Sequence, residues 1–161
     1  MHVINGIVEK ADGTFLEGFF FADLKEQNVD HKIILGTYPL FEVDVEKMKA
    51  AGVTAVLNLK TNAEMSQRGV DELNLKTWYA KRGITEYERY PLVEDPESAY
   101  VRGIFEACKL LDQLLQRKHR VYVHCTAGRS RSATLCLVYL CLFLKSKSWQ
   151  DPSKVESLLV S

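Results

Sequence analysis

The chain has 161 residues, of which 47% are hydrophobic and 26% are charged, and these values are ordinary for a single globular domain with a sizeable core. Its 21 basic and 21 acidic side chains give a formal net charge of zero, which argues against the basic excess that is typical of nucleic-acid-binding proteins. Any anion that the protein recognises must therefore be held by positive groups placed locally.

The cysteine pattern and the chain start indicate a reduced, cytoplasmic setting without a bound metal. The spacing of the cysteines matches neither zinc sites nor small disulfide frameworks, and they are Cys108, Cys125, Cys136 and Cys141. The sequence MHVINGIVEKADG has no basic start followed by an apolar run, so no signal peptide is predicted. The longest apolar run, residues 133–144, has about 12 residues where roughly 20 are needed to span a bilayer, so we expect a buried core helix.

The first 30 residues form a segment with its own pattern. The runs IVEK and TFLEGFFFA flank Ala11-Asp12-Gly13, and Asp-Gly between apolar runs is a hairpin signal. We therefore expect an N-terminal extension over residues 1–30 that forms a hairpin, followed by the main domain over residues 31–161.

The main domain alternates between strand and helix patterns. In chain order we predict a strand over 33–36, a helix over 43–52, a strand over 54–59, a helix over 70–83, a strand over 84–92, a helix over 101–115, a strand over 121–124 and a helix over 130–144. This alternation predicts an α/β fold with a central, largely parallel sheet flanked by helices.

One predicted helix has a particularly regular apolar face. Its hydrophobic residues recur at intervals of three and four, which places them on one side of a helix. They are Val101, Ile104, Phe105, Cys108, Leu111, Leu114 and Leu115. We expect this face to pack against the sheet.

The segment HCTAGRSRS, residues 124–132, joins the short strand VYV to the apolar helix. Ligands of open α/β sheets bind at the carboxyl ends of strands, and a helix N-terminus offers unpaired N–H groups and partial positive charge to an anion. The loop is long enough to direct its N–H groups at phosphate oxygens, and Gly128 removes a side chain where the loop is tightest. The predicted phosphate-binding residues are Thr126, Ala127, Gly128, Arg129, Ser130 and Arg131.

The same surroundings suit a cysteine nucleophile. A free thiol has a pKa near ~8.5, which a helix N-terminus and adjacent cations lower by one to several units, so Cys125 is expected to be a thiolate. The planar fork of Arg131 can hold two phosphate oxygens, which a lysine cannot do. We expect Ser132 to hydrogen-bond the sulfur and His124 to order the loop.

HCTAGRSRS resembles the signature loop of the protein tyrosine phosphatase superfamily, H-C-x-x-G-x-x-R-S/T, and VYVHCTAGRSRSATLCLVYL resembles the dual-specificity branch in particular. The resemblance extends over roughly residues 31–160 and includes ILGTYPL and AVLNLK. It implies a phosphatase domain over 31–161 that uses neither metal nor other cofactor.

The resemblance also implies a general acid on the loop after the preceding strand, where this chain has YPLVEDPESAY. We predict that Asp95, which lies 30 residues before Cys125, protonates the leaving oxygen. Glu94 is the alternative acid, and a solvated acidic turn is the non-catalytic interpretation.

The substrate class stays open at this point. A phosphoprotein phosphatase acting on phosphotyrosine and phosphoserine or phosphothreonine is favoured by AGRSRSAT. A phosphoglucan phosphatase of the laforin or starch-excess kind is an alternative, with Trp78, Tyr79 and Tyr90 as candidate sugar-binding aromatics. Two further classes fit the same loop: a lipid-headgroup phosphatase, resembling the mitochondrial phosphatidylglycerophosphate phosphatase, and a non-catalytic phosphate-binding module.

Overall fold

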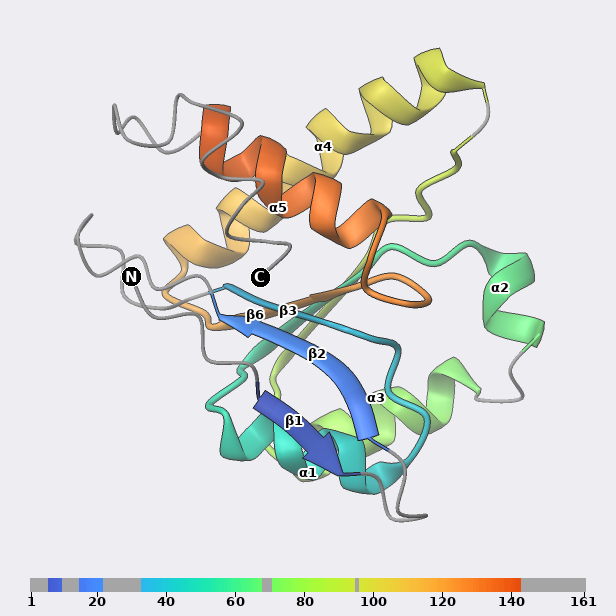
Figure 1. The fold of residues 1–161 in the computed structure, drawn as a ribbon. Coiled ribbons are helices and arrows are strands. Elements are labelled where there is room, and N and C mark those ends of the chain that lie inside the picture. The colour runs from blue at the N-terminus through green and yellow to red at the C-terminus, as the bar shows by residue number, and fades with distance from the viewer. Residues whose placement is uncertain (1–5, 10–14, 22–32, 68–70, 95, 143–161) are drawn as a thin grey trace.

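The computed structural model describes residues 6–9, 15–21, 33–67, 71–94 and 96–142, and of the first two segments it describes the backbone alone. The strands are β1 Gly6–Glu9, β2 Phe15–Phe21, β3 Ile33–Gly36, β4 Ala55–Asn58, β5 Glu86–Arg89 and β6 Val121–His124. The helices are α1 Glu42–Ala50, α2 Asn62–Gln67, α3 Glu72–Lys81, α4 Glu97–Gln116 and α5 Arg131–Leu142. Figure 1 shows these elements in their spatial arrangement.

The strands form one sheet in the order β1-β2-β3-β6-β4-β5. β6 lies in the middle of its parallel part, with Val121 opposite both Ile33 of β3 and Ala55 of β4. β5 continues the parallel part on the far side of β4. The predicted α/β fold with a largely parallel central sheet is confirmed.

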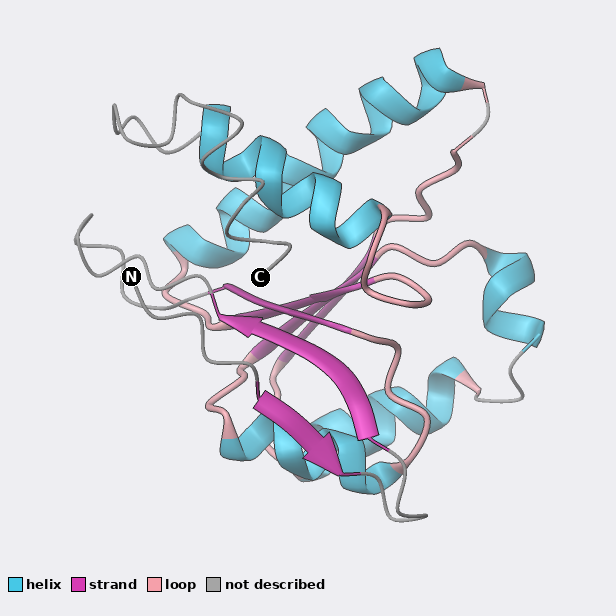
Figure 2. Ribbon diagram, in the orientation of Figure 1, coloured by secondary structure: helices cyan, strands magenta, loops and turns pink. Residues whose placement is uncertain are grey.

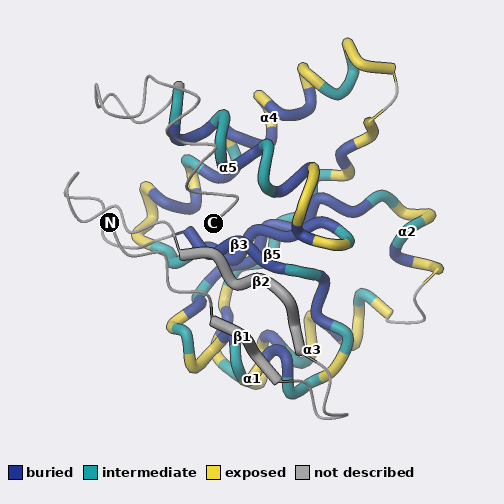
Figure 3. Tube along the Cα trace, in the orientation of Figure 1, coloured by how far each residue is buried: buried dark blue, intermediate teal, exposed yellow. Residues whose placement is uncertain are grey.

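Helices cover both faces of the sheet, α4 and α5 on one face and α1 and α3 on the other (Figures 1 and 2). Alternate residues of β6 pack on opposite faces of the sheet. Val121 and Val123 belong to the hydrophobic cluster with α4 and α5, whereas Tyr122 belongs to the hydrophobic cluster with α1 and α3. Because both faces are covered, the strands β3, β4 and β6 are buried along their whole length, as Figure 3 shows.

The N-terminal strands extend the sheet on the β3 side. β1 and β2 pair in antiparallel fashion, with Val8 opposite Leu16, and β2 pairs in the same manner with β3, with Phe20 opposite Leu35. The turn predicted at residues 11–13 lies outside the described residues, and the division of the chain near residue 30 stays a prediction.

One helix face differs in part from the sequence prediction. On α4 five residues of the predicted face are buried as expected, namely Ile104, Cys108, Leu111, Leu114 and Leu115, but Val101 and Phe105 are 48% and 42% exposed. The first turns of α4 extend past α5 (Figure 1), which agrees with the exposure of these two side chains. On α3, Leu73 is exposed, and the residues buried four positions apart are Leu75 and Tyr79.

The parallel arrangement brings several loops to one edge of the sheet. β3, β6, β4 and β5 run in the same direction, so their carboxyl ends lie together. The loops that follow them lead to α1, α5, α2 and α4 respectively. Residues from distant parts of the sequence therefore meet around the start of α5.

Candidate active site

The loop from Cys125 to Ser130 turns sharply between β6 and α5. It packs against the end of β3 and the residues that follow that strand. Gly128 adopts φ +74°, and a Cβ atom there would lie 2.7 Å from the carbonyl oxygen of Gly36. The Tyr38 N–H donates to the Thr126 carbonyl at 3.3 Å. Glycine is therefore required at position 128 both by its backbone conformation and by the close approach of the Gly36 segment.

Cys125 lies at the base of this loop, 2% exposed, with its Sγ atom 3.3 Å from the Ser132 hydroxyl oxygen. Burial alone would raise the pKa of the Cys125 thiol. Hydrogen bonds from the Ser132 hydroxyl and N–H and from the Gly128 N–H, together with the charge of Arg131, outweigh burial and lower this pKa below its ordinary value. The surroundings predicted to stabilise a thiolate, with Ser132 beside the sulfur, are present.

His124 is completely buried beneath the loop. Its Nδ1 atom lies 3.0 Å from the Cys125 carbonyl oxygen, so Nδ1–H is the donor of this hydrogen bond. Burial, reinforced by the positive charge of Lys60, lowers the pKa of His124 to about 4. A neutral imidazole that holds the Cys125 carbonyl agrees with the loop-ordering role predicted for His124.

The lowered pKa of His124 predicts a pH-dependent stability. Below pH 6.5 the unfolded chain takes up a proton on His124, whereas the folded protein does so only near pH 4. The free energy of unfolding should therefore fall by up to about 3 kcal/mol as the pH drops from 6.5 to 4. Chemical denaturation at pH 6.5, 5.5 and 4.5 measures this loss.

The His124→Asn variant is the control for that measurement, because it removes the titrating group whatever its own cost in stability. Protonation of Glu64, whose pKa is also lowered in the folded protein, destabilises the fold in the same direction but mainly below about pH 4.5. If the free energy of unfolding fell equally with pH between 6.5 and 4.5 in the wild-type and His124→Asn proteins, the prediction would be contradicted.

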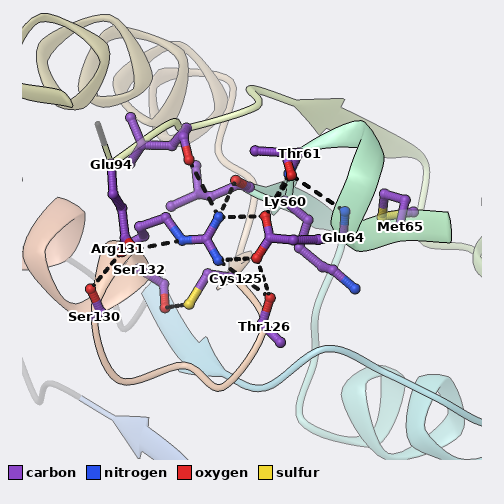
Figure 4. Close-up of polar contacts among 12 residues, drawn as sticks. Lys60, Thr61, Glu64, Met65, Glu94, Cys125, Thr126, Ser130, Arg131 and Ser132 are labelled. Atoms are coloured by element: carbon purple, nitrogen blue, oxygen red, sulfur yellow. Dashed lines mark hydrogen bonds and ion pairs between the residues drawn. The ribbon is translucent and has the colours of Figure 1, made fainter. Parts of the chain in front are cut away.

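Arg131 is the first residue of α5 and is 8% exposed. Its guanidinium makes a two-point contact with the carboxylate of Glu64 of α2. Its Nη1 atom donates to Glu64 Oε2 at 2.7 Å, and its Nη2 atom donates to Glu64 Oε1. Nη1 also approaches the carbonyl oxygen of Leu92 at 3.3 Å. The guanidinium is thus fixed by Glu64 of α2 and by the segment that follows β5, and Figure 4 shows its contacts with Glu64.

Glu64 is a site residue that the sequence patterns did not indicate as functional. It accepts a hydrogen bond from the Thr126 hydroxyl at 2.7 Å, so it ties both ends of the loop to α2. The hydrogen bond from Arg131 is the largest cause of a pKa of Glu64 far below the ordinary value. One sequence pattern could have pointed to this position, because Thr61-x-x-Glu64 has the form of a helix capping box. In the structure the Thr61 N–H donates to Glu64 Oε2 at 2.9 Å, and the Glu64 N–H donates to the Thr61 hydroxyl at 3.4 Å.

The acidic loop after β5 also reaches the phosphate-binding loop. Glu94 Oε1 accepts a hydrogen bond from the Ser130 hydroxyl at 2.9 Å and lies 3.6 Å from Arg131 Nε. Asp95 lies outside the described residues, so its role as the acid stays a prediction.

The remaining residues predicted to bind phosphate lie in the outer part of the loop. Ala127, Arg129 and Ser130 are exposed, whereas Thr126 is partly buried by its contact with Glu64. The structure therefore brings Cys125, Ser132 and Arg131 together at the base and leaves Arg129 at the rim.

The part of the chain that the structure describes contains neither a metal site nor a membrane-spanning helix. No group of three or more His, Cys, Asp or Glu side chains there is arranged to hold a metal ion. None of the helices in these segments has the length and apolar character needed to cross a membrane.

Comparison with protein families identifies a match over most of the chain. Residues 33–152 match the model of the dual specificity phosphatase catalytic domain. This range begins at β3 and includes the whole candidate site.

Two relatives illustrate the range of similar proteins. Phosphoglucan phosphatase LSF1, chloroplastic, of Arabidopsis thaliana is 31% identical over 118 residues, which cover 73% of this chain and 20% of that protein. Dual specificity protein phosphatase 2 of Mus musculus is 35% identical over 98 residues, which cover 60% of this chain and 26% of that protein. The chain thus spans only about a fifth to a quarter of the length of these curated relatives.

Solved structures share the fold. A kinase-associated phosphatase with serine in place of its catalytic-site cysteine superimposes with a TM-score of 0.68 at 20% identity, covering 88% of this chain and 81% of that one. PTPMT1 in complex with PI(5)P gives a TM-score of 0.58 at 25% identity, covering 81% of this chain and 78% of that one.

Proposed function

Because the chain belongs to the dual-specificity phosphatase family, we propose that it hydrolyses phosphotyrosine and phosphoserine or phosphothreonine in proteins through a cysteinyl-phosphate on Cys125. The observation that carries this proposal is the position of the Cys125 sulfur, which is buried beside the Ser132 hydroxyl at the N-terminus of α5 and next to Arg131. This arrangement favours an ionised sulfur and an anionic ligand at the same place.

In the first step, the Cys125 thiolate attacks phosphorus and forms the P–S bond while the bond from phosphorus to the leaving oxygen breaks. Loop N–H groups and Arg131 stabilise the charge on the phosphoryl oxygens. Glu64 holds the Nη atoms of Arg131, so the guanidinium does not have to be ordered when substrate binds. Asp95 gives its proton to the leaving oxygen.

In the second step, water attacks the phosphorus of the cysteinyl-phosphate and gives a proton to the Asp95 carboxylate. The P–S bond breaks, its electron pair returns to sulfur, and phosphate leaves. The Ser132 hydroxyl, 3.3 Å from Sγ, stabilises the departing thiolate.

The acid predicts a dependence on the leaving group. Asp95→Asn should lower kcat about 100-fold on phenyl phosphate, whose phenolate leaves poorly without a proton. The loss should be about 10-fold or less on 4-nitrophenyl phosphate, whose leaving group needs little protonation. Equal losses on the two substrates would contradict the assignment of Asp95 as the acid.

A phosphoglucan is the second candidate substrate, and the similarity to a phosphoglucan phosphatase over 73% of this chain favours it. Among the aromatic residues considered for sugar binding, Tyr79 is excluded, because it lies in the core and is only 1% exposed. Trp78 is partly buried against the cluster of α1 and α3, and Tyr90 is partly buried against that of α4 and α5. The two therefore pack on opposite faces of the sheet.

Phosphate release from three substrates tests the proposal: doubly phosphorylated Tyr/Thr peptides, phosphorylated amylopectin and phosphatidylglycerophosphate vesicles. We expect the highest kcat/KM on the peptides, with no release by Cys125→Ser. Preferential release from amylopectin would favour the glucan instead, and preferential release from vesicles would favour a lipid headgroup.

A further inference from the structure

We propose that Glu94 is a positioning residue that latches the acid loop, which the structure describes at Val93, Glu94 and Pro96, onto the phosphate-binding loop through the hydroxyl of Ser130. The inference rests on the proposed function, because it assigns Glu94 to holding the loop that carries Asp95. It gives Ser130 a side-chain role in addition to the backbone role of the loop.

The contact itself joins two loops that are 36 residues apart in the chain. Glu94 Oε1 accepts the Ser130 hydroxyl proton at 2.9 Å, and the same oxygen lies 3.6 Å from Arg131 Nε. Figure 4 shows the Glu94 side chain directed at the start of α5. A carboxylate that receives a hydrogen bond and faces a guanidinium makes a stronger tie than a neutral acceptor would.

The ends of the acid loop are anchored in other ways. Leu92 is 1% exposed, its N–H donates to the Leu59 carbonyl at 3.0 Å, and its carbonyl accepts from Arg131 Nη1 at 3.3 Å. At the other end, the Pro96 carbonyl begins α4 by accepting from the Ala99 N–H at 2.9 Å.

Between these anchors the two described residues of the loop are exposed to solvent. Val93 is 51% exposed, and the Glu94 side chain is 56% exposed. The Glu94 contact is the polar tie that the described residues show between the middle of the loop and the phosphate-binding loop. Asp95 follows Glu94 directly, so loss of this tie should free the backbone that carries the acid.

The latch differs from two other roles for Glu94. If Glu94 were itself the acid, glutamine would disable it as fully as alanine, and Ser130 would not share its effect. If Glu94 were a plug beside Arg131 that substrate phosphate must displace, its removal would lower KM and leave kcat intact. A latch instead predicts a fall in kcat that glutamine, which keeps an acceptor oxygen, largely restores.

The experiment is a double-mutant cycle with Glu94→Ala, Ser130→Ala and the double variant, with kcat measured on phenyl phosphate and 4-nitrophenyl phosphate. Each single variant and the double variant should lose roughly 3- to 10-fold on phenyl phosphate, which is the range for one hydrogen bond, and less on 4-nitrophenyl phosphate. Glu94→Gln should remain within about 3-fold of wild type. The matched control Glu97→Ala, which removes an exposed carboxylate on the first turn of α4, should change neither rate.

Amide hydrogen exchange of residues 92–94 gives a readout that does not depend on activity. Exchange there should be faster in Glu94→Ala and Ser130→Ala than in wild type and in Glu97→Ala. Unchanged exchange, additive losses in the double variant, or failure of glutamine to restore kcat would each overturn the latch. A wild-type protein that hydrolyses neither ester would instead refute the proposed function, and the exchange data would still decide on the latch.

Discussion

Serine in place of Cys125 is expected to remove phosphatase activity, lowering kcat/KM by at least about 10⁴-fold. The effect is large because the hydroxyl of serine does not ionise near neutral pH, whereas the hydrogen bonds from Ser132 and Gly128 and the charge of Arg131 lower the pKa of the thiol. Without an anionic nucleophile the cysteinyl-phosphate cannot form. Steady-state hydrolysis of 4-nitrophenyl phosphate measures the loss.

Cys141→Ser is the matched control, because Cys141 is a partly buried cysteine of α5, the helix that follows the loop, and has no role in the mechanism. Its activity should stay within about twofold of wild type, as expected for a substitution away from the reacting atoms. The Cys125→Ser protein should retain its fold, which circular dichroism and thermal unfolding can verify. Residual activity of Cys125→Ser above about one-hundredth of wild type would refute Cys125 as the nucleophile.

Lysine in place of Arg131 is expected to lower kcat/KM by about 10³-fold although the positive charge is kept. The guanidinium donates through Nη1 and Nη2 to the two oxygens of Glu64 and through Nη1 to the Leu92 carbonyl. A lysine ammonium cannot reproduce this planar set of donors, so it would lose the two-point contact with Glu64 that fixes the cation beside Cys125.

Arg117→Lys controls for the chemical change, since Arg117 forms a surface pair with Glu86 at 3.2 Å and should leave the rate unchanged. The Glu64→Gln variant separates the two functions of the guanidinium: it keeps Arg131 but weakens its anchor, so it should lose activity less severely than Arg131→Lys. A lysine variant with activity within about 10-fold of wild type would show that positive charge alone is sufficient there.

The loop and its immediate surroundings could be predicted because they are local in sequence. Strand, loop and helix follow one another within residues 121–142, so the order of apolar and polar residues determines each element. The prediction that Gly128 fills the tightest part of the loop agrees with its φ of +74°. The alternation of strands and helices likewise predicts the α/β class.

Short elements and outer faces are harder to predict from the sequence. The six-residue helix α2 is too short to show helical periodicity, so only its capping box marks it. Val101 and Phe105 of α4 follow the apolar spacing but are exposed, because spacing describes a helix face and does not say which neighbours cover it.

The sequence by itself predicted the nucleophile and the arginine, because both lie in one short segment of the chain, and it determined the fold class through the alternation of strand and helix patterns. Only the tertiary structure placed Glu64 on Arg131 and Glu94 on Ser130, across separations of 67 and 36 residues. The physical reason is the parallel sheet: the order β3-β6-β4-β5 brings the loops after β4, β5 and β6 to one edge. That order is set by packing over the whole domain, which local periodicity does not encode.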